Sequence, residues 1–258
     1  MKELSIRVTS GLIGLFLLTF IVFKGGILLS LSVYIVAMIG IRELYKAMEK
    51  INIKPIYVLG YLWTTGFFLN TLLEFNYFEF ILALTMIILL ILIVLRENIK
   101  IQDVAMTILG MIYIPFLLFH VIKLDGSKYI WLIFIISFGT DTFAYITGNL
   151  FGKNKLCPKI SPNKTIEGSI GGIIGSSILT IIFSIYFNLG PLWQIIILSI
   201  ICSILAQLGD LVASKIKRVT GIKDYGFIMP GHGGALDRFD SIIFTAPVVY
   251  YYISSFLI

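Results

Sequence analysis

Residues 78–95 read FEFILALTMIILLILIVL, and this run decides the fold class of the chain. Glu79 is its only charged residue, and polar and apolar positions do not alternate along it. A run of this length forms a helix that crosses a bilayer, because about 20 apolar residues span the hydrocarbon core. A strand of a membrane barrel would alternate in polarity from residue to residue, so the run is not a strand.

Eight more apolar segments accompany this one, and 58% of all residues are apolar against 13% charged. Such a composition indicates a polytopic membrane protein rather than a soluble domain. The first two segments are short, so a re-entrant hairpin is an alternative to two crossings there. We therefore predict an all-α polytopic integral membrane protein with about nine transmembrane helices, or seven plus a re-entrant hairpin. The predicted segments are Ser10–Phe23, Gly26–Ile41, Pro55–Leu73, Phe78–Leu95, Val104–Ile122, Tyr129–Leu150, Ile170–Leu189, Trp193–Ala213 and Ile242–Ile258.

Lysine and arginine residues are distributed unevenly over the predicted loops, and they set the orientation. With nine crossings, all but three of the 20 cationic side chains (Lys24, Lys123 and Lys128) fall on one side. The positive-inside rule makes that side cytoplasmic, which predicts a cytoplasmic N-terminus and two cytosolic loops, 149–168 and 214–241. Topology and anionic headgroups also account for the pI of about 9.2, so the charge requires no nucleic-acid partner.

The loop at residues 214–241, SKIKRVTGIKDYGFIMPGHGGALDRFDS, concentrates charge in a chain that has little elsewhere. Its glycines, Gly231, Gly233 and Gly234, allow the backbone to approach a phosphate closely, with amides able to donate hydrogen bonds. His232 can bind a phosphate or transfer a proton. The side chains that could neutralise phosphate oxygens are Lys217, Arg218, Lys223 and Arg238.

Acidic residues next to apolar segments are candidate metal ligands, because charge within a span costs about 2.5–3.5 kcal/mol on insertion scales. Asp210 lies in the last turn of its segment, and Asp237 and Asp240 are three residues apart, so both face the same way on a helix. These three offer the oxygen ligands that suit Mg²⁺. Asp141, in the inner half of another span, is a further candidate. A capping or helix-pairing role is the alternative for Asp141 and Asp210.

Carboxylates that hold a metal, cationic clamps and a glycine turn are the components that phosphoryl or nucleotidyl transfer requires. An ordinary cytosolic loop would explain the lysines but not three glycines around a histidine. One alternative function is a secondary transporter for an anionic solute, which is disfavoured because no broken span recurs in the two halves. Another is a related membrane lipid phosphotransferase, such as a polyprenol kinase.

The glycine-rich run at residues 168–175, GSIGGIIG, contains two overlapping small-xxx-small patterns. Small residues at this spacing let two helices approach closely. The run therefore predicts tight helix packing, either within the fold or between subunits.

The C-terminal half resembles the phosphatidate cytidylyltransferase (CDP-diacylglycerol synthase) family over roughly residues 138–245. The motif Ser214-x-Ile216-Lys217-Arg218-x4-Lys223-Asp224-x-Gly226, followed by Pro230-x-His232-Gly233-Gly234-x-x-Asp237-Arg238-x-Asp240, is similar to the family signature. Upstream, the motifs Asp141-Thr-Phe-Ala-Tyr145, Ile160-Ser-Pro-x-Lys164-Thr165-x-Glu167-Gly168 and Gln207-x-Gly209-Asp210 are similar as well. Met229 and Ala235 depart from the family pattern but remain apolar, so they affect local packing rather than chemistry. In the N-terminal half only Arg7 and Glu43 stand at plausible positions.

The resemblance implies transfer of CMP from CTP to phosphatidic acid, with CDP-diacylglycerol and pyrophosphate as products. It implies Mg²⁺ as the cofactor, with a monovalent cation such as K⁺ as a second possibility. The catalytic residues it suggests are Asp210, Asp237, Asp240, His232 and Lys223. The metal ligands are the same three aspartates together with Asp141. The substrate-binding residues are Ser161, Lys164, Thr165, Ser214, Lys217, Arg218, Gly233, Gly234 and Arg238.

The resemblance and the topology together predict how the protein is organised in the cell. We expect a multi-pass protein of the plasma (inner) membrane, with an active site that faces the cytoplasm. Residues 1–100 are predicted as N-terminal transmembrane helices and residues 101–258 as the catalytic region that carries both cytosolic loops. The glycine-rich run and the resemblance also favour a homodimer.

Overall fold

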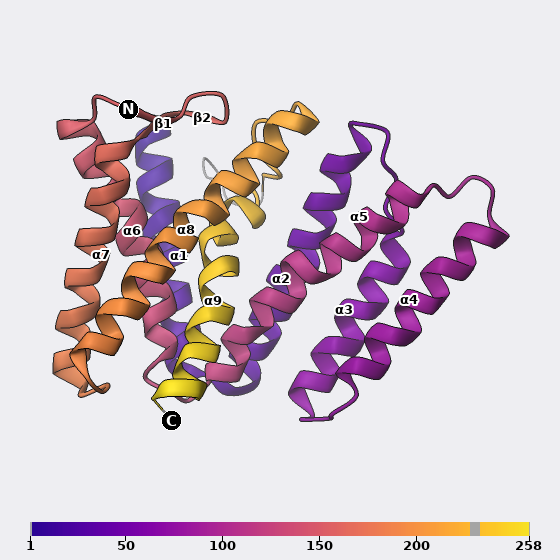
Figure 1. The fold of residues 1–258 in the computed structure, drawn as a ribbon, viewed down its shortest axis with the longest axis horizontal. Coiled ribbons are helices and arrows are strands. Elements are labelled where there is room, and N and C mark those ends of the chain that lie inside the picture. Colours follow the sequence, from indigo (N-terminus) through magenta and orange to yellow (C-terminus); the bar gives the residue numbers. More distant parts are fainter. Residues whose placement is uncertain (1, 228–232, 258) are drawn as a thin grey trace. The chain divides into compact units, whose positions relative to one another are not determined.

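The structure is a computed structural model that describes residues 2–227 and 233–257, and these form nine α-helices (Figure 1). The predicted all-α class is confirmed. Two short irregular helices, η1 (Ile112–Phe116) and η2 (Phe119–Leu124), follow α5. The helices are α1 (Lys2–Lys24), α2 (Gly26–Glu49), α3 (Tyr57–Leu72), α4 (Phe78–Leu95), α5 (Ile101–Met111), α6 (Ile130–Phe151), α7 (Ile166–Phe187), α8 (Leu192–Thr220) and α9 (Leu236–Phe256).

Six helical segments among the described residues are long and apolar enough to cross a membrane. They confirm a polytopic membrane protein. α2 has 24 residues, and at about 1.5 Å per residue this exceeds the roughly 30 Å of a hydrocarbon core. Its length therefore suits a full crossing better than half of a re-entrant hairpin. The six segments are Gly26–Glu49, Phe78–Leu95, Ile101–Leu124, Ile130–Phe151, Ile166–Phe187 and Leu192–Thr220.

The predicted span at residues 104–122 is not one regular helix. α5 ends at Met111, a π-helical turn follows, and a 3₁₀ segment continues to Leu124. Pro115 lies inside the π-helical turn. Proline has no N–H and its ring clashes with the preceding turn, so the α-helical hydrogen-bond pattern cannot continue through it.

The chain divides into two compact units, which do not follow the predicted division at residue 100. Unit 1 comprises Met1–Lys123 and Val219–Arg238, and unit 2 comprises Leu124–Arg218 and Phe239–Ile258. In unit 1, Tyr45 of α2 is fully buried, and its hydroxyl donates to the carbonyl of Thr107 in α5 at 2.7 Å. Gly60 and Gly110 face the Tyr45 ring, where a Cβ would collide with it. This contact joins α2, α3 and α5.

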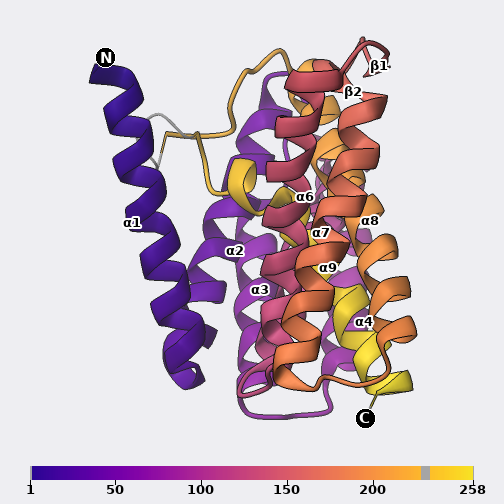
Figure 2. The ribbon, with the colours of Figure 1, turned by 90° about the vertical axis from the view of Figure 1, so that its left-hand side faces the viewer.

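In unit 2, α6 and α7 lie side by side along their length (Figures 1 and 2). The glycine-rich run forms this contact. A Cβ on Gly172 would lie 2.9 Å from the carbonyl oxygen of Thr140 and 3.1 Å from Cβ of Ala144. Gly171 faces Thr147 and Gly175 faces Phe143 in the same way. The run thus packs within the fold, the first of the two predicted possibilities.

Replacing Gly172 by leucine is expected to separate α6 from α7. Four added carbons cannot fit at a backbone contact this close, and overpacking costs about 1–3 kcal/mol even in adaptable cores. We expect a Tm lower by at least about 4 °C in detergent, measured by thermal unfolding. Ile174→Leu is the control, since Ile174 on the same helix is exposed. An unchanged Tm for Gly172→Leu would contradict this packing.

Buried hydroxyl groups connect the other helices of unit 2. Thr140 of α6 donates to Ser203 of α8 at 2.8 Å, and Ser137 of α6 lies 3.0 Å from the Thr245 hydroxyl of α9. All four residues are fully buried. Because these polar groups satisfy one another, α6, α8 and α9 can pack without leaving a hydroxyl unpaired at these positions.

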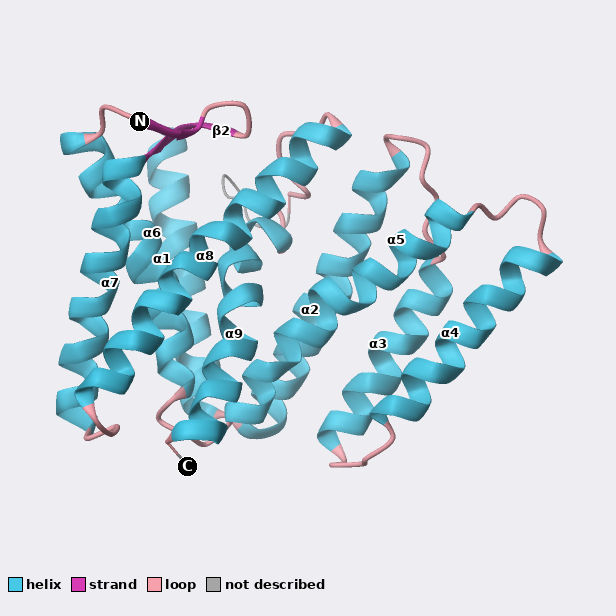
Figure 3. Cartoon of the chain, in the orientation of Figure 1, coloured by secondary structure: helices cyan, strands magenta, loops and turns pink. Residues whose placement is uncertain are grey.

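A small β-hairpin, which the sequence analysis did not predict, lies between α6 and α7 (Figure 3). β1 (Lys155–Cys157) pairs antiparallel with β2 (Ser161–Thr165). Glu167, in the first turn of α7, accepts hydrogen bonds from the backbone N–H groups of Lys153 and Asn154 at 3.1–3.2 Å. The hairpin is therefore tied to the start of α7, and the predicted 149–168 loop is largely ordered structure.

Candidate functional site

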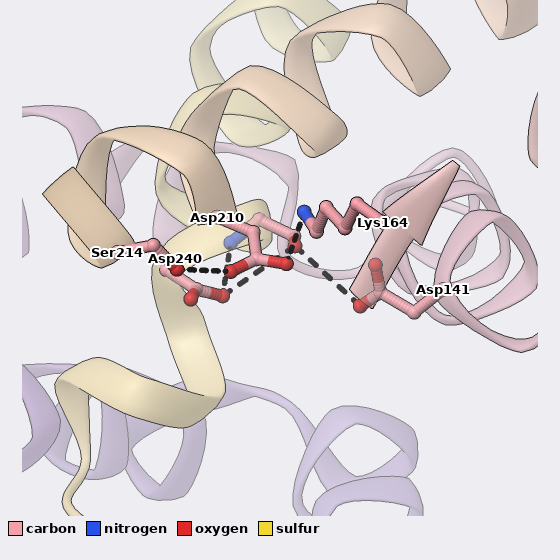
Figure 4. A network of polar contacts seen from close by, with 6 residues as sticks. Asp141, Lys164, Asp210, Ser214 and Asp240 are labelled. Atoms are coloured by element: carbon pink, nitrogen blue, oxygen red, sulfur yellow. Dashed lines mark hydrogen bonds and ion pairs between the residues drawn. The ribbon is translucent and has the colours of Figure 1, made fainter. Parts of the chain in front are cut away.

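Three aspartates from three helices of unit 2 meet at one place, which we call the acidic cluster: Asp141 of α6, Asp210 of α8 and Asp240 of α9. Figure 4 shows these side chains pointing toward one another. The hydroxyl of Ser241 lies 3.5 Å from Oδ2 of Asp141 and 3.4 Å from Oδ1 of Asp240, so it bridges two of them. Asp240 is only 8% exposed. Of the three aspartates predicted to converge, Asp210 and Asp240 are close enough for their charges to interact.

The close approach of α8 and α9 brings Asp210 to Asp240. Gly209 permits it, because a Cβ at this position would lie 2.5 Å from the carbonyl oxygen of Asp240 and 2.9 Å from the ring of Phe244. Any larger residue would push the two helices apart. The close packing of α8 against α9 therefore explains why the residue before Asp210 is a glycine.

Lys164 of β2 forms an ion pair with Asp210, and the Ser214 hydroxyl donates to the same carboxylate at 3.2 Å (Figure 4). Lys164 and Asp210 are partly exposed, at 26% and 30%. Asp240 experiences repulsion from the Asp210 and Asp141 charges, which the charge of Lys217 partly offsets. Cations of the chain itself therefore compensate a cluster that would otherwise repel itself strongly.

The donor set of the acidic cluster fits a hard divalent cation, because carboxylate oxygens with a nearby hydroxyl are what Mg²⁺ prefers. Within residues 2–227 and 233–257, no three His, Cys, Asp or Glu side chains are already gathered as closely as metal ligands. In the structure the carboxylate of Asp210 forms an ion pair with the ammonium group of Lys164. Binding of a divalent ion would have to replace this ion pair.

Asp237, the remaining predicted ligand, organises the loop before α9 within unit 1. Its Oδ2 accepts hydrogen bonds from the backbone N–H of Tyr225 at 2.8 Å and of Gly234 at 3.0 Å. The Gly234 amide, a predicted phosphate donor, donates to Asp237 in the structure and would have to exchange this partner to bind a phosphate. Gly233 has φ +82°, which explains glycine at this position without a ligand.

The predicted phosphate-binding cations lie around these two regions. Lys217 and Arg218 are in the last turn of α8, and Nε of Arg218 donates to the carbonyl of Ile160 at 3.1 Å in unit 2. In unit 1, Lys223 and Arg238 are exposed. The prediction for His232 lies outside the described residues.

One residue of the hairpin contacts the acidic cluster, and the other predicted site residues of the hairpin contact neighbouring backbone. Lys164 is the one that reaches it. Thr165 caps α7: its Oγ1 accepts the Gly168 N–H at 3.1 Å, and the side chain is buried. Ser161 pairs with Cys157 across the hairpin. These contacts give Thr165 a structural role at the start of α7.

Two residues of these regions were not assigned a role from the sequence. Ser241, which bridges Asp141 and Asp240, carries no signal beyond its place after Asp240. Glu43 of α2 accepts hydrogen bonds from the backbone N–H groups of Ala235 and Leu236. Glu43 stands among Arg42, Lys46 and Glu49 at the charged end of α2, so the sequence does not set it apart, and only its burial does.

Comparison with known proteins gives one family and a group of close relatives. The model of the cytidylyltransferase family matches residues 5–256. A phosphatidate cytidylyltransferase of Staphylococcus haemolyticus is 38% identical, over 95% of this chain and 97% of the relative. Those of Staphylococcus saprophyticus and Staphylococcus aureus are 38% and 35% identical with the same coverage.

Proposed function

The chain belongs to the cytidylyltransferase family, and we propose that its chemistry takes place at the acidic cluster of Asp141, Asp210 and Asp240. It is a phosphatidate cytidylyltransferase, which transfers CMP from CTP to phosphatidic acid and releases pyrophosphate. This assignment decides against an anion transporter and against a kinase of another lipid. The observation that carries the site is the convergence of Asp210 and Asp240, with Lys164 beside them.

The reaction joins two anions, and its charge determines what the protein must supply. A phosphate oxygen of phosphatidate attacks the α-phosphorus of CTP, the new P–O bond forms, and the bond to the β-phosphate oxygen breaks. The electron pair of that bond leaves with pyrophosphate. Because the attacking phosphate is already ionised, no strong general base is required. Compensation of negative charge and alignment of the two phosphates are the main tasks.

Asp210 and Asp240 are the proposed principal ligands of Mg²⁺, with Asp141 and Asp237 as further ligands. Bound there, Mg²⁺ would neutralise phosphate charge and stabilise the leaving pyrophosphate. Ser241 supports the site by holding Asp141 and Asp240 in place. A second, monovalent cation such as K⁺ remains part of the proposal on the family resemblance alone.

The cations of the loops are the proposed phosphate ligands. Lys217 and Arg218 lie at the end of α8, both about two turns beyond Asp210, and Lys164 forms an ion pair with Asp210. Arg offers a planar fork to two phosphate oxygens, whereas Lys acts as a point charge. Together they can hold a triphosphate beside the acidic cluster. The remaining proposed binders are Ser161, Thr165, Ser214, Lys223, His232, Gly233, Gly234 and Arg238.

The apolar helices make the protein a membrane protein. We propose the plasma membrane and a cytoplasmic active site, because the cation-rich loops include the ones that carry Lys164 and Lys217. In unit 2 the contact of Arg218 with Ile160 supports this orientation, since it joins the two loops predicted on the same side. A homodimer remains a proposal that rests on the resemblance, because the glycine-rich run packs within the chain.

The activity is tested with purified protein, labelled CTP, phosphatidate and Mg²⁺ in detergent. Formation of labelled CDP-diacylglycerol, dependent on the divalent ion and abolished by EDTA, is the expected result. Diacylglycerol and undecaprenol serve as alternative acceptors, to separate this reaction from lipid kinases. No product from phosphatidate, under conditions in which the S. aureus relative is active, would overturn the proposal.

Lys164→Met is expected to change metal binding and turnover in opposite directions. Without the ammonium group, a divalent ion no longer competes with Lys164 for Asp210, so Mn²⁺ affinity without CTP should rise about 3–10-fold, which is about 0.7–1.4 kcal/mol. Turnover should fall because a phosphate ligand is lost. Mn²⁺ titration followed by electron paramagnetic resonance measures the first effect, and Lys159→Met, on the same hairpin, is the control. Weaker Mn²⁺ binding in Lys164→Met would contradict the competition.

A further inference from the structure

Glu43 is a carboxylate in an unusual place. It lies near the end of α2, a helix apolar enough to cross the membrane, and it is only 7% exposed. A buried carboxylate needs hydrogen-bond donors, because desolvation otherwise makes its charge very costly. Within unit 1, backbone N–H groups close to the start of α9 supply them.

Both carboxylate oxygens of Glu43 are occupied by consecutive backbone amides. Oε1 accepts from the N–H of Ala235 at 3.1 Å, and Oε2 accepts from the N–H of Leu236 at 2.8 Å. The first amides of a helix have no partner within the helix, and the helix dipole favours a negative charge there. Glu43 thus caps α9 from a position 193 residues away in the sequence.

Two glycines of the α8–α9 loop (residues 221–235) are pressed against the same carboxylate. A Cβ on Gly226 would lie 3.1 Å from Cδ of Glu43, and one on Gly234 would lie 2.6 Å from it. The same Cβ added to Gly226 would lie only 3.3 Å from Cα of Gly234. Glu43 therefore contacts the backbone at both Gly226 and Gly234, and a side chain at either position would collide with its carboxylate.

Glu43 and Asp237 share the task of fixing this loop. Asp237 accepts the N–H of Tyr225 and Gly234, while Glu43 accepts those of Ala235 and Leu236. The two carboxylates repel each other, so four backbone donors stabilise a pair of like charges. Such an arrangement fixes the backbone more strongly than neutral side chains could, because each charged acceptor forms shorter and stronger hydrogen bonds.

We infer that Glu43 is a positioning residue for CMP transfer: it fixes the start of α9 and the backbone at Gly226 and Gly234, and so sets where Asp237 and Arg238 stand. This inference rests on the proposed function, in which Asp237 and Arg238 bind the metal and phosphates. In this role Glu43 acts through the backbone it holds, and not by binding substrate or metal itself. Because these two carboxylates already hold the backbone at residues 225 and 234–236, CTP binding does not have to supply the free energy of fixing it there.

Glu43→Gln tests this role because it keeps the shape and one acceptor oxygen but places an NH₂ group against a backbone N–H. We expect the KM for CTP to rise about 10-fold, with kcat changed by less than about twofold. A residue that only stabilises the fold would lower the active fraction, which reduces kcat and leaves KM unchanged. Glu49→Gln, an exposed glutamate of the same helix, is the control.

Hydrogen exchange gives a readout that does not depend on activity. The amides of residues 225 and 234–236 should exchange at least about 10-fold faster in Glu43→Gln than in the parent protein, with or without CTP. A second variant, Gly226→Ala, displaces the Glu43 carboxylate without removing its charge and should give the same shift in KM.

Several outcomes overturn the inference. One is unchanged exchange and KM in Glu43→Gln, and another is a fall in kcat with constant KM. Failure of both variants to fold, while Glu49→Gln folds, would make Glu43 a residue of the fold alone. Suppose that the parent protein produces no CDP-diacylglycerol while the exchange of these amides still accelerates in Glu43→Gln. In that case the proposed function would fail, but the structural role of Glu43 in fixing the backbone of residues 225 and 234–236 would hold.

Discussion

Asp240→Asn is expected to reduce CMP transfer at least about 100-fold while the protein remains folded. Loss of a residue that only orients a metal ligand costs about 10–100-fold, so the loss of a ligand should cost more. Asparagine keeps the size and one oxygen of Asp240, but it cannot supply the carboxylate that a metal ion would bind beside Asp210 and Asp141. The substitution should therefore lower the rate of CMP transfer without disturbing the packing around residue 240.

The thermal stability of Asp240→Asn shows whether Asp240 acts as a metal ligand or only stabilises the fold. Asp240 is buried and repelled by two carboxylates, so its neutral replacement should leave the Tm unchanged or raise it. Initial rates with labelled CTP and thermal unfolding in detergent are the two measurements. Glu97→Gln, an exposed acid between α4 and α5, is the matched control. A rate within about threefold of the parent protein would remove Asp240 from the metal site.

Asp237→Asn is expected to lose turnover to a similar extent, at least about 100-fold. Oδ2 of Asp237 accepts two backbone hydrogen bonds, and the amide oxygen of asparagine can accept the same two. The backbone at Tyr225 and Gly234 should therefore keep these hydrogen bonds while the charge of residue 237 is lost. Rates together with hydrogen exchange of Tyr225 and Gly234 measure both effects.

The pair of readouts for Asp237→Asn decides between two roles. Loss of turnover with unchanged exchange means that Asp237 acts through its charge, as a ligand. Near-normal turnover would show that its two hydrogen bonds are its whole function, and the metal site would then consist of Asp141, Asp210 and Asp240. Loss of turnover with faster exchange would likewise count against the ligand role.

Hydropathy predicted the helices well, because a membrane leaves few alternatives for an apolar segment. α4 begins and ends at the predicted residues, Phe78 and Leu95. The helix boundaries near the loops predicted as cytosolic were less accurate: α8 continues to Thr220 and α9 begins at Leu236. Polar residues can continue a helix beyond the span, and hydropathy does not detect this.

The acidic cluster was also predictable, but its surroundings were not. Aspartates at span ends are costly, so Asp141, Asp210 and Asp240 were conspicuous in the sequence. The ion pair of Lys164 with Asp210 depends on the hairpin, which a short polar sequence does not indicate. The contact of Glu43 with Ala235 and Leu236 joins residues almost 200 positions apart. One sequence contains no local pattern for such a contact.

The glycines of the α8–α9 loop show how the same sequence feature can have a different physical reason. They suggested backbone amides that receive phosphate. In the structure, Gly226 and Gly234 make room for the Glu43 carboxylate, and Gly233 adopts a left-handed conformation. A packing requirement and a binding requirement both select glycine, and only the three-dimensional contacts distinguish them.

The central claim is that Asp210 and Asp240 hold a divalent ion beside the phosphates of CTP. Pulsed electron paramagnetic resonance of Mn²⁺ bound to the purified protein with CTP tests it most directly, through the coupling of the ion to ³¹P. The account predicts one tightly bound Mn²⁺ with ³¹P coupling in the parent protein, and loss of that signal in Asp240→Asn. The same protein-bound, ³¹P-coupled signal at equal affinity in Asp240→Asn would contradict it.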